Sequence, residues 1–313
     1  MLRATNNHSQ RMTKKERLAG SIIGGAIGDA WGSAYENVLP NINQNTFYLG
    51  RLTSAKPTWS FTDDTQLTLV TLEASLAVDR LTPEKLASYF VHYYKKRQIT
   101  GMGSSTLKSF QELEVGGHWS QVGRTGEYAA GNGAAMRIAP FAFYDTYTKE
   151  DIRNFCRITH RNDEAYVGAL AIVLSIRQIL NGSWSGDSSL IELILPDLPD
   201  TNVRDRLIEL DKLKGENNII EASKFGTSGY VVNSVPLAIF CASQVKSIGI
   251  ESMFEQLIQC GGDTDTNASI AGHIAGTFTG DQSLPLALTE RLTLVPGYEW
   301  LNETVNKLKA RMN

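Results

Sequence analysis

The amino-acid sequence predicts an all-α fold. Apolar residues recur at helical spacing along most of the chain, runs of alternating β-branched residues are scarce, and glycine-rich segments separate the helical stretches. With 313 residues, 42% hydrophobic and 20% charged, the chain is long and apolar enough to bury a large core. Because no Pro/Ser-rich linker and no internal repeat divides it, we expect one compact domain.

Composition excludes several functional classes. The 30 basic and 33 acidic residues give a net charge of −3, which argues against nucleic acid as a partner. Three cysteines are too few for a disulfide framework or a cysteine-rich zinc site, so we expect a reduced, cytoplasmic protein. Residues 226–245 carry no charge but contain Asn233, Pro236 and Gln244, which indicates a buried core segment. We therefore expect no membrane association.

The first 17 residues are polar and basic, with five basic residues against one acidic residue. This composition predicts a flexible N-terminal tail over residues 1–17, followed by a folded domain over residues 18–313. A second interpretation is that the tail is a partner-binding arm.

The expected helices begin with a stretch in which Gly24, Gly28 and Gly32 recur every four residues. A second helix follows Asp64, and a third starts at residues 82–84, where a threonine cap precedes a proline. Residues 164–180 are apolar almost all round, as in a buried helix. Further apolar helical faces occur at 254–258 and at 300–308.

A second small-residue helix contains Gly272 and Gly276, again four residues apart. Glycine inside a helix costs about 1 kcal/mol relative to alanine. Close approach to a neighbouring backbone is the usual compensation. We therefore expect the two glycine-rich helices to pack centrally.

Two clusters of aspartate and threonine each begin a predicted helix. They are residues 62–65, Thr-Asp-Asp-Thr, and residues 263–266, Asp-Thr-Asp-Thr. Either cluster alone is explained by N-capping, since both residue types are preferred there. If the clusters converge, their carboxylates would repel one another unless cations neutralised them. Oxygen ligands of this kind suit Mg²⁺, Mn²⁺ or Ca²⁺ rather than zinc.

Other motifs fit the second cluster less well. An EF-hand loop starting at Asp263 would need glycine and glutamate where Ala268 and Ile274 stand. A haloacid dehalogenase-like phosphatase loop would follow a strand, whereas a helical segment comes first here. Neither a phosphate-binding GxxxxGK[ST] loop nor a GxSxG nucleophile elbow is present.

Two glycine-rich loops could bring backbone amides close to an anion such as a diphosphate. They are residues 131–133, Gly-Asn-Gly, and the weaker residues 101–105. His160 precedes the buried helix, where a single histidine is more often a structural residue than a catalyst.

Taken together, these motifs resemble the ADP-ribosylglycohydrolase family, which includes the dinitrogenase reductase-activating glycohydrolase and the ADP-ribosylhydrolases. They occur in family order over about residues 18–280. The resemblance implies an all-α, orthogonal helical domain with two Mg²⁺ or Mn²⁺ ions. The motifs are Gly24-x-x-x-Gly28-Asp29-Ala30-x-Gly32, Phe61-Thr62-Asp63-Asp64-Thr65, Gly131-Asn132-Gly133-x-x-Met136-Arg137, Thr159-His160, Gly229-Tyr230 and Gly261-Gly262-Asp263-Thr264-Asp265-Thr266.

The resemblance also implies roles for individual residues. The implied catalytic residues are Glu36, Asp64 and Asp263, with Glu36 or an aspartate taking a proton from water. The implied metal ligands are Thr62, Asp63, Asp64, Asp263, Asp265 and Thr266. The implied ADP-ribose-binding residues are Gly103, Ser104, Gly131, Asn132, Gly133, His160, Gly229 and Tyr230.

The expected activity is removal of ADP-ribose from modified proteins, with arginine-linked mono-ADP-ribose favoured. Residues 101–103 read Gly-Met-Gly, where arginine-directed members often carry Asp-Ile-Gly, so serine-linked or polymeric ADP-ribose is an alternative substrate. A second alternative is a non-catalytic ADP-ribose-binding or partner-blocking, immunity-type protein. The basic tail could bind an ADP-ribosyltransferase or a toxin.

Overall fold

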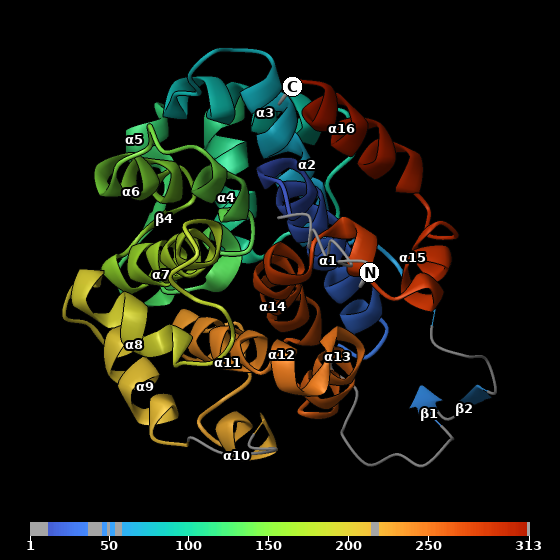
Figure 1. Ribbon diagram of the computed structural model, residues 1–313. Helices are drawn as coiled ribbons and strands as arrows, with labels where there is room; N and C mark the ends of the chain where they lie inside the picture. Colours follow the sequence, from blue (N-terminus) through green and yellow to red (C-terminus); the bar gives the residue numbers. More distant parts are fainter. Residues whose placement is uncertain (1–11, 37–45, 49–50, 54–57, 214–218, 312–313) are drawn as a thin grey trace, which may run out of the picture.

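The computed structural model describes residues 12–36, 46–48, 51–53, 58–213 and 219–311, and this part of the chain is predominantly helical (Figure 1). The all-α prediction is confirmed. Its α-helices are α1 (Lys14–Ser33), α2 (Asp63–Leu76), α3 (Pro83–Lys95), α4 (Ser104–Glu114), α5 (Trp119–Val122), α6 (Lys149–Arg157), α7 (Asp163–Leu180), α8 (Leu190–Ile194), α9 (Asn202–Asp211), α10 (Ile219–Ser223), α11 (Val231–Ser243), α12 (Val245–Ile248), α13 (Ile250–Gln259), α14 (Thr264–Thr279), α15 (Leu286–Leu292) and α16 (Tyr298–Arg311).

The described strands are short and form two small sheets. Strand β1 (Thr46–Tyr48) pairs antiparallel with β2 (Arg51–Thr53), and β3 (Arg124–Thr125) pairs in parallel with β4 (His160–Arg161). The second sheet matters for the site, because it fixes the segment that carries His160. Five short 3₁₀ segments complete the described elements: Glu127–Ala129, Asn132–Ala134, Ala139–Phe143, Leu195–Asp197 and Asp281–Ser283.

Helices α1 and α14 lie side by side at the centre of the molecule (Figure 1). Their glycines form the contact: a Cβ atom on Gly24 would lie 2.5 Å from the carbonyl oxygen of Gly272. The equivalent atom on Gly28 would collide with the carbonyl of Ala268. The predicted central packing of the two glycine-rich helices is therefore confirmed. The cost of glycine in each helix is offset by close backbone approach.

Helices α7 and α11 extend this core on the other side of α14. Almost every residue of α7 between Ala165 and Ile176 is buried, as the apolar sequence predicts. Helix α11 is buried along most of its length and accommodates Pro236 in its interior, which agrees with the prediction of a core segment. Among the described residues, no helix is both long and apolar enough to span a bilayer.

The C-terminal helix α16 packs against α2, and Glu73 anchors that contact. Its carboxylate accepts hydrogen bonds from the Tyr93 hydroxyl and from the indole of Trp300, the latter at 2.9 Å. The two aromatic rings stack 5.3 Å apart. Helix α3 begins at Pro83 behind the predicted cap, Thr82.

Helix α1 begins at Lys14, which corrects the expected end of the tail at residue 17. Thr13 and Glu16 form a capping box: the Thr13 hydroxyl accepts from the Glu16 amide, and the Glu16 carboxylate accepts from the Thr13 amide at 2.7 Å. Arg17 bonds the carbonyl of Thr277 on α14. Residues 14–17 thus belong to the domain, and residues 1–11 of the predicted tail lie outside the described residues.

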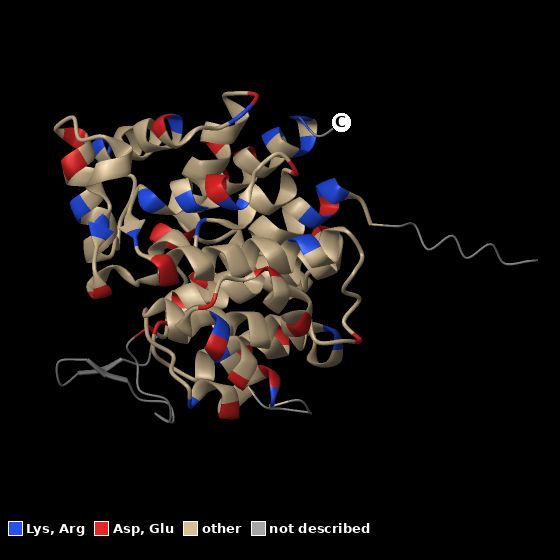
Figure 2. Cartoon of the chain, turned by 90° about the vertical axis from the view of Figure 1, so that its left-hand side faces the viewer, with Lys and Arg blue, Asp and Glu red and all other residues tan. Residues whose placement is uncertain are grey.

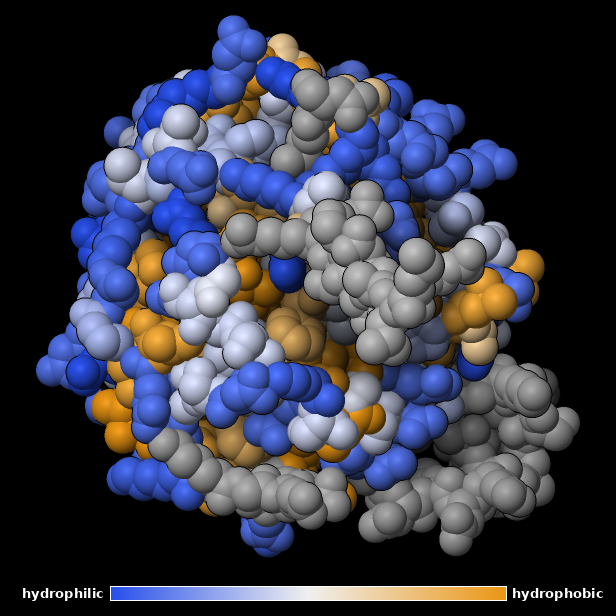
Figure 3. Space-filling view, viewed as in Figure 1, coloured by the Kyte–Doolittle hydropathy of each residue, from blue (hydrophilic) through white to orange (hydrophobic). Residues whose placement is uncertain are grey.

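Charged residues of both signs are interspersed over the outer helices, in keeping with the small net charge (Figure 2). On the face seen in Figure 3, hydrophobic residues reach the surface of the described part in small areas separated by hydrophilic ones. Cys156 and Cys241 are buried free thiols, and Cys260 is a partly buried one.

Candidate metal centre and substrate site

Asp29, from the fifth turn of α1, joins that helix to the start of α2. Its buried carboxylate accepts hydrogen bonds from the amides of Thr62 and Thr65, at 3.1 and 3.2 Å, and from both hydroxyls. Thr62 also caps α2, because its hydroxyl accepts a bond from the amide of Asp64. The carboxylate thereby fixes the segment that carries the first acidic cluster.

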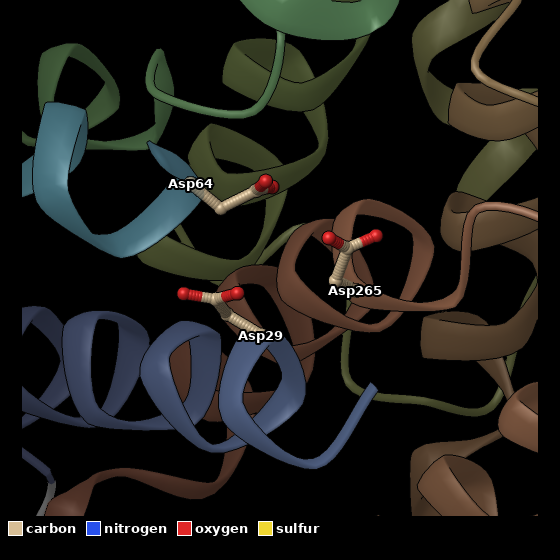
Figure 4. A group of neighbouring side chains, drawn as sticks. All are labelled: Asp29, Asp64 and Asp265. Atoms are coloured by element: carbon tan, nitrogen blue, oxygen red, sulfur yellow. The ribbon is translucent and has the colours of Figure 1, made fainter. Parts of the chain in front are cut away.

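The two acidic clusters meet. Carboxylate oxygens of Asp29, Asp64 and Asp265 lie within 4.8 Å of one another, and in Figure 4 the three side chains, from α1, α2 and α14, surround a common space. The Thr266 hydroxyl lies 3.2 Å from Asp64 Oδ2. The predicted convergence of residues 62–64 with residues 263–266 is therefore present in the structure.

Asp265 also belongs to a second acidic group. Carboxylate oxygens of Glu36, Asp263 and Asp265 lie within 4.8 Å of one another. Glu36 follows the C-terminus of α1 and is exposed, whereas Asp265 is buried. One aspartate is thus shared by two adjacent groups of three acids.

Burial raises the pKa values of four acids of the centre, Asp29, Asp63, Asp64 and Asp265, and neighbouring carboxylates add to the shift at the last three. Desolvation is the main cause at Asp63, whose pKa rises to about 8, and at Asp265, whose pKa rises to about 9. Asp64 is shifted upward in pKa for the same reasons, and Asp29 reaches a pKa of about 6 despite four hydrogen bonds. Each of these carboxyl groups therefore favours its neutral form unless a positive charge lies beside it.

The residues present fit hard divalent cations. Every donor is a carboxylate or hydroxyl oxygen, the set preferred by Mg²⁺, Mn²⁺ and Ca²⁺. Asp64 Oδ1 is buried and makes no hydrogen bond, so a buried carboxyl oxygen is left for another partner. N-capping does not explain the second cluster: the Asp263 side chain makes no cap bond, and instead accepts from Asn132 Nδ2 at 2.6 Å.

The bond from Asn132 attaches the glycine loop 131–133 to the acidic centre. The backbone N–H of Asn132 donates to the Gly229 carbonyl at 3.1 Å, and Gly131 forms an isolated antiparallel β-bridge with Tyr230. A Cβ atom on Gly229 would lie 3.0 Å from Asp263 Oδ2. Four of the residues predicted to bind ADP-ribose are therefore gathered around Asp263.

His160 lies on the far side of the same loop. Its imidazole packs against the loop so closely that a Cβ atom on Gly133 would lie 3.0 Å from Cε1. The ring is 3% exposed, and burial together with Arg137 and Arg124 lowers its pKa to about 3. The structure thus places a neutral histidine against the predicted anion-binding loop.

Loop 101–104 lies beside the first acidic cluster. A Cβ atom on Gly101 would lie 3.7 Å from Asp63 Oδ1. Gly103 caps α4 and has open space next to its Cα, and the hydroxyl of Ser104 accepts a bond from Arg124 at 2.9 Å. The predicted site residues Gly103 and Ser104 follow Gly101 directly, and Gly101 is the residue of this loop that contacts Asp63.

A polar cavity of about 370 Å³ is lined in part by strand β4 itself, through His160 and Arg161. Three arginines line it, namely Arg153, Arg157 and Arg161, together with one acid, Asp163. Asp163 pairs with Arg153 at 3.4 Å, so the cavity keeps an excess of positive charge. Its chemistry suits an anionic group.

Comparison with known proteins agrees with the motifs. The sequence profile of the ADP-ribosylglycohydrolase family matches residues 10–313. The chain belongs to the ADP-ribosylglycohydrolase family. It is 27% identical over 313 residues to ADP-ribosylhydrolase ARH3 of Mus musculus, covering 86% of this chain and 83% of that protein. It is 24% identical to ADP-ribosylarginine hydrolase Tri1 of Serratia proteamaculans, covering 74% and 63%.

A solved ADP-ribosylglycohydrolase-related protein complex has the same fold. Its TM-score is 0.71, at 22% identity, over 95% of this chain and 98% of that one. Family membership and the named relatives make this chain a hydrolase.

The metal ligands expected from the sequence did not include Asp29, which the structure places in the acidic centre with Asp64 and Asp265. It stands inside a helix dominated by glycine and apolar residues, where a fully buried carboxylate needs a partner. That anomaly, an acid within a small-residue helix, is the sequence signal that could have identified it.

Proposed function

We propose that this enzyme removes ADP-ribose from modified proteins, with arginine-linked mono-ADP-ribose as its preferred substrate and two Mg²⁺ or Mn²⁺ ions as cofactors. The observation that carries the proposal is the pair of acidic groups sharing Asp265, next to a glycine loop and a neutral histidine. The names of the ARH3 and Tri1 relatives support the substrate class.

Asp29, Asp64 and Asp265 would hold one cation, and Glu36, Asp263 and Asp265 the other, with Thr62, Asp63 and Thr266 completing the donor set. A divalent cation at this position supplies Lewis-acid polarisation of sugar and water oxygens. The glycine loop 131–133 and His160 would bind the diphosphate and ribose portion through backbone amides and the ring N–H.

Glu36 is suited to proton transfer. It is the exposed member of its acidic group, so its carboxylate can exchange protons with solvent. In the proposed reaction a water attacks the anomeric carbon of the distal ribose, Glu36 takes the water proton, and the bond to the protein side chain breaks. Glu36 then passes this proton to the leaving nitrogen, so that free arginine re-forms and the carboxylate is regenerated.

The preferred linkage depends on loop 101–103. Gly101 adopts φ +82°, a conformation that strains other residues, and it adjoins Asp63. Many arginine-directed members carry an aspartate at the position of Gly101. In this chain the position has a backbone conformation that favours glycine over aspartate. The name of the Tri1 relative, an ADP-ribosylarginine hydrolase, supports an arginine linkage in the substrate of this enzyme. The serine linkage is the alternative, and the assay must include it.

The test is release of free ADP-ribose from arginine-linked and serine-linked peptides with Mg²⁺, Mn²⁺ or EDTA. We expect arginine-linked substrate to be hydrolysed faster, and EDTA to abolish turnover. Asp263→Asn should lower kcat by at least about 100-fold, through lost electrostatic stabilisation. The matched control is Asp187→Asn, which removes an exposed acid paired with Lys246. Binding of ADP-ribose without turnover would instead favour the non-catalytic alternative.

The basic composition of residues 1–17 supports a second, separate proposal, namely that this N-terminal segment, with Arg3 and Arg11 ahead of α1, binds an ADP-ribosyltransferase or toxin. Because the capping box of α1 begins at Thr13, deletion of residues 1–11 leaves that helix start intact. We expect the deletion to weaken capture of the transferase while hydrolysis is unchanged. If the full chain and the chain lacking residues 1–11 capture the transferase equally well, the proposal of a partner-binding N-terminal segment is wrong.

A further inference from the structure

A buried cation lies beneath His160. Arg137 is fully buried, and its Nη2 donates a hydrogen bond of 2.8 Å to the hydroxyl of Thr159. Its guanidinium sits 4.9 Å from the ring of Phe90, and within the described chain it forms no ion pair with a carboxylate. Keeping an arginine here is costly, which points to a specific purpose.

The same hydroxyl contacts the imidazole. Thr159 Oγ1 lies 2.8 Å from His160 Nδ1. A guanidinium can only donate, so the hydroxyl accepts from Arg137 and keeps its single proton for another acceptor. Among the described residues the acceptor in reach is Nδ1. The hydroxyl proton finds its acceptor when Nδ1 is unprotonated, and this arrangement places the proton of His160 on Nε2.

Nε2 faces the glycine loop. A Cβ atom on Gly131 would lie 3.3 Å from Nε2, and one on Gly133 would lie 3.5 Å from it. The absence of side chains at both positions leaves the ring N–H next to the backbone that would receive the substrate. The hydrogen-bond chain thus ends in one donor aimed at the loop.

We propose that Arg137 is a positioning residue that acts through Thr159 to hold His160 as the neutral Nε2–H tautomer, a fixed donor to an oxygen of the bound ADP-ribose. The ligand part of this inference rests on the proposed function. The tautomer itself rests only on the contacts among the three side chains.

The direct test is the ¹⁵N NMR signature of the histidine ring at pH 7 in the full-length protein. We expect Nε2 of His160 to be protonated and Nδ1 to carry the shift of an unprotonated, hydrogen-bonded nitrogen. Thr159→Val should give a mixture of tautomers, and Thr159→Ser should restore the wild-type signature. An Nδ1–H tautomer in the wild type, or no change in Thr159→Val, would overturn the proposal.

His273 provides the internal folding control. It is 2% exposed, lies in the α1–α14 contact against Gly25, and is remote from the Thr159 substitution in sequence. Its ring signals should be unchanged in the folded variants. Arg137→Met is a second variant that frees the Thr159 hydroxyl, and we expect the same tautomer mixture from it. Retention of a pure Nε2–H form in Arg137→Met would contradict a role for the arginine.

Binding of free ADP-ribose by calorimetry measures the consequence. Loss of one well-oriented donor should raise Kd about tenfold in Thr159→Val. Thr159→Ser should bind like the wild type, and KM for the modified peptide should change more than kcat. Wild-type protein that neither binds nor hydrolyses ADP-ribosylated compounds would refute the proposed function, while the NMR result would still decide the tautomer.

Discussion

At the scale of single residues, the acids of the centre differ in how many hydrogen bonds offset the cost of burying each carboxylate. Asp29 is fully buried, yet its hydrogen bonds from Thr62 and Thr65 keep its pKa near 6. At Asp265, burial is the main cause of a pKa that rises to about 9, and the acidic neighbours, Asp263 first, raise it further. The repulsion is thus concentrated on the residues that a cation would neutralise.

This distribution predicts that the metal-free protein loses stability as pH rises from 7 to 9. The raised pKa values of Asp63 and Asp265 mean that the folded state holds more protons than the unfolded state, so the free energy of unfolding falls with pH. Below about pH 6.5 the lowered pKa values of His160 and His273 oppose the trend. We expect a decrease on the order of a few kcal/mol, measured by urea unfolding in EDTA. A flat profile over that range would contradict it.

Asp265→Asn should separate stability from function. With a folded-state pKa of about 9, Asp265 must take up a proton on folding at pH 8, whereas asparagine need not, so the metal-free variant should be more stable than the metal-free wild type by about 1–2 kcal/mol. The same variant should show no thermal stabilisation on adding Mn²⁺. Asp187→Asn, at an exposed ion pair, should leave both properties unchanged.

At the scale of secondary structure, the α1–α14 contact depends on glycine for steric reasons. Gly28→Ala places a methyl group against the carbonyl of Ala268, and neither helix can retreat because both are buried. We expect a loss of about 1–3 kcal/mol in unfolding free energy. Gly103→Ala, which enters open space, is the control and should be nearly neutral in stability. Equal effects at both sites would show that glycine packing is not the determinant.

The elements themselves were largely predictable from the sequence. Helical spacing located α2, α3, α7, α13 and α16, because each covers the core with one apolar face or, for α7, with nearly all of its surface. The short sheet β3–β4 left no such signal, since two-residue strands have no periodicity. The capping box at Thr13 outweighed the basic composition that placed residues 14–17 in the tail.

The candidate site was predictable only in part, for a physical reason. Two acidic clusters 200 positions apart raise the possibility of convergence, but only packing of α1, α2 and α14 brings them together. Asp29 and the Arg137–Thr159 contact carry no local pattern, because their significance lies in burial and in partners distant in sequence.

At the scale of the whole molecule, the centre joins three helices from opposite ends of the chain. Asp29, Asp64 and Asp265 come from α1, α2 and α14. Cation binding should therefore stabilise the global fold, by about 2.7 kcal/mol at a concentration 100 times Kd. Hydrogen exchange with and without Mn²⁺ should show slowing in all three helices. Protection confined to one helix would indicate a merely local site.

The pairing of α1 with α14 also determines when the protein can fold during synthesis. Helix α1 ends at residue 33, but the helix that covers its glycine face begins only at residue 264. During synthesis, the glycine face of α1 therefore stays without its packing partner α14 while about 230 further residues are translated. The α1–α14 contact and the acidic centre therefore form only after α14 has been translated, and truncated chains that end before α14 should be bound by chaperones or degraded.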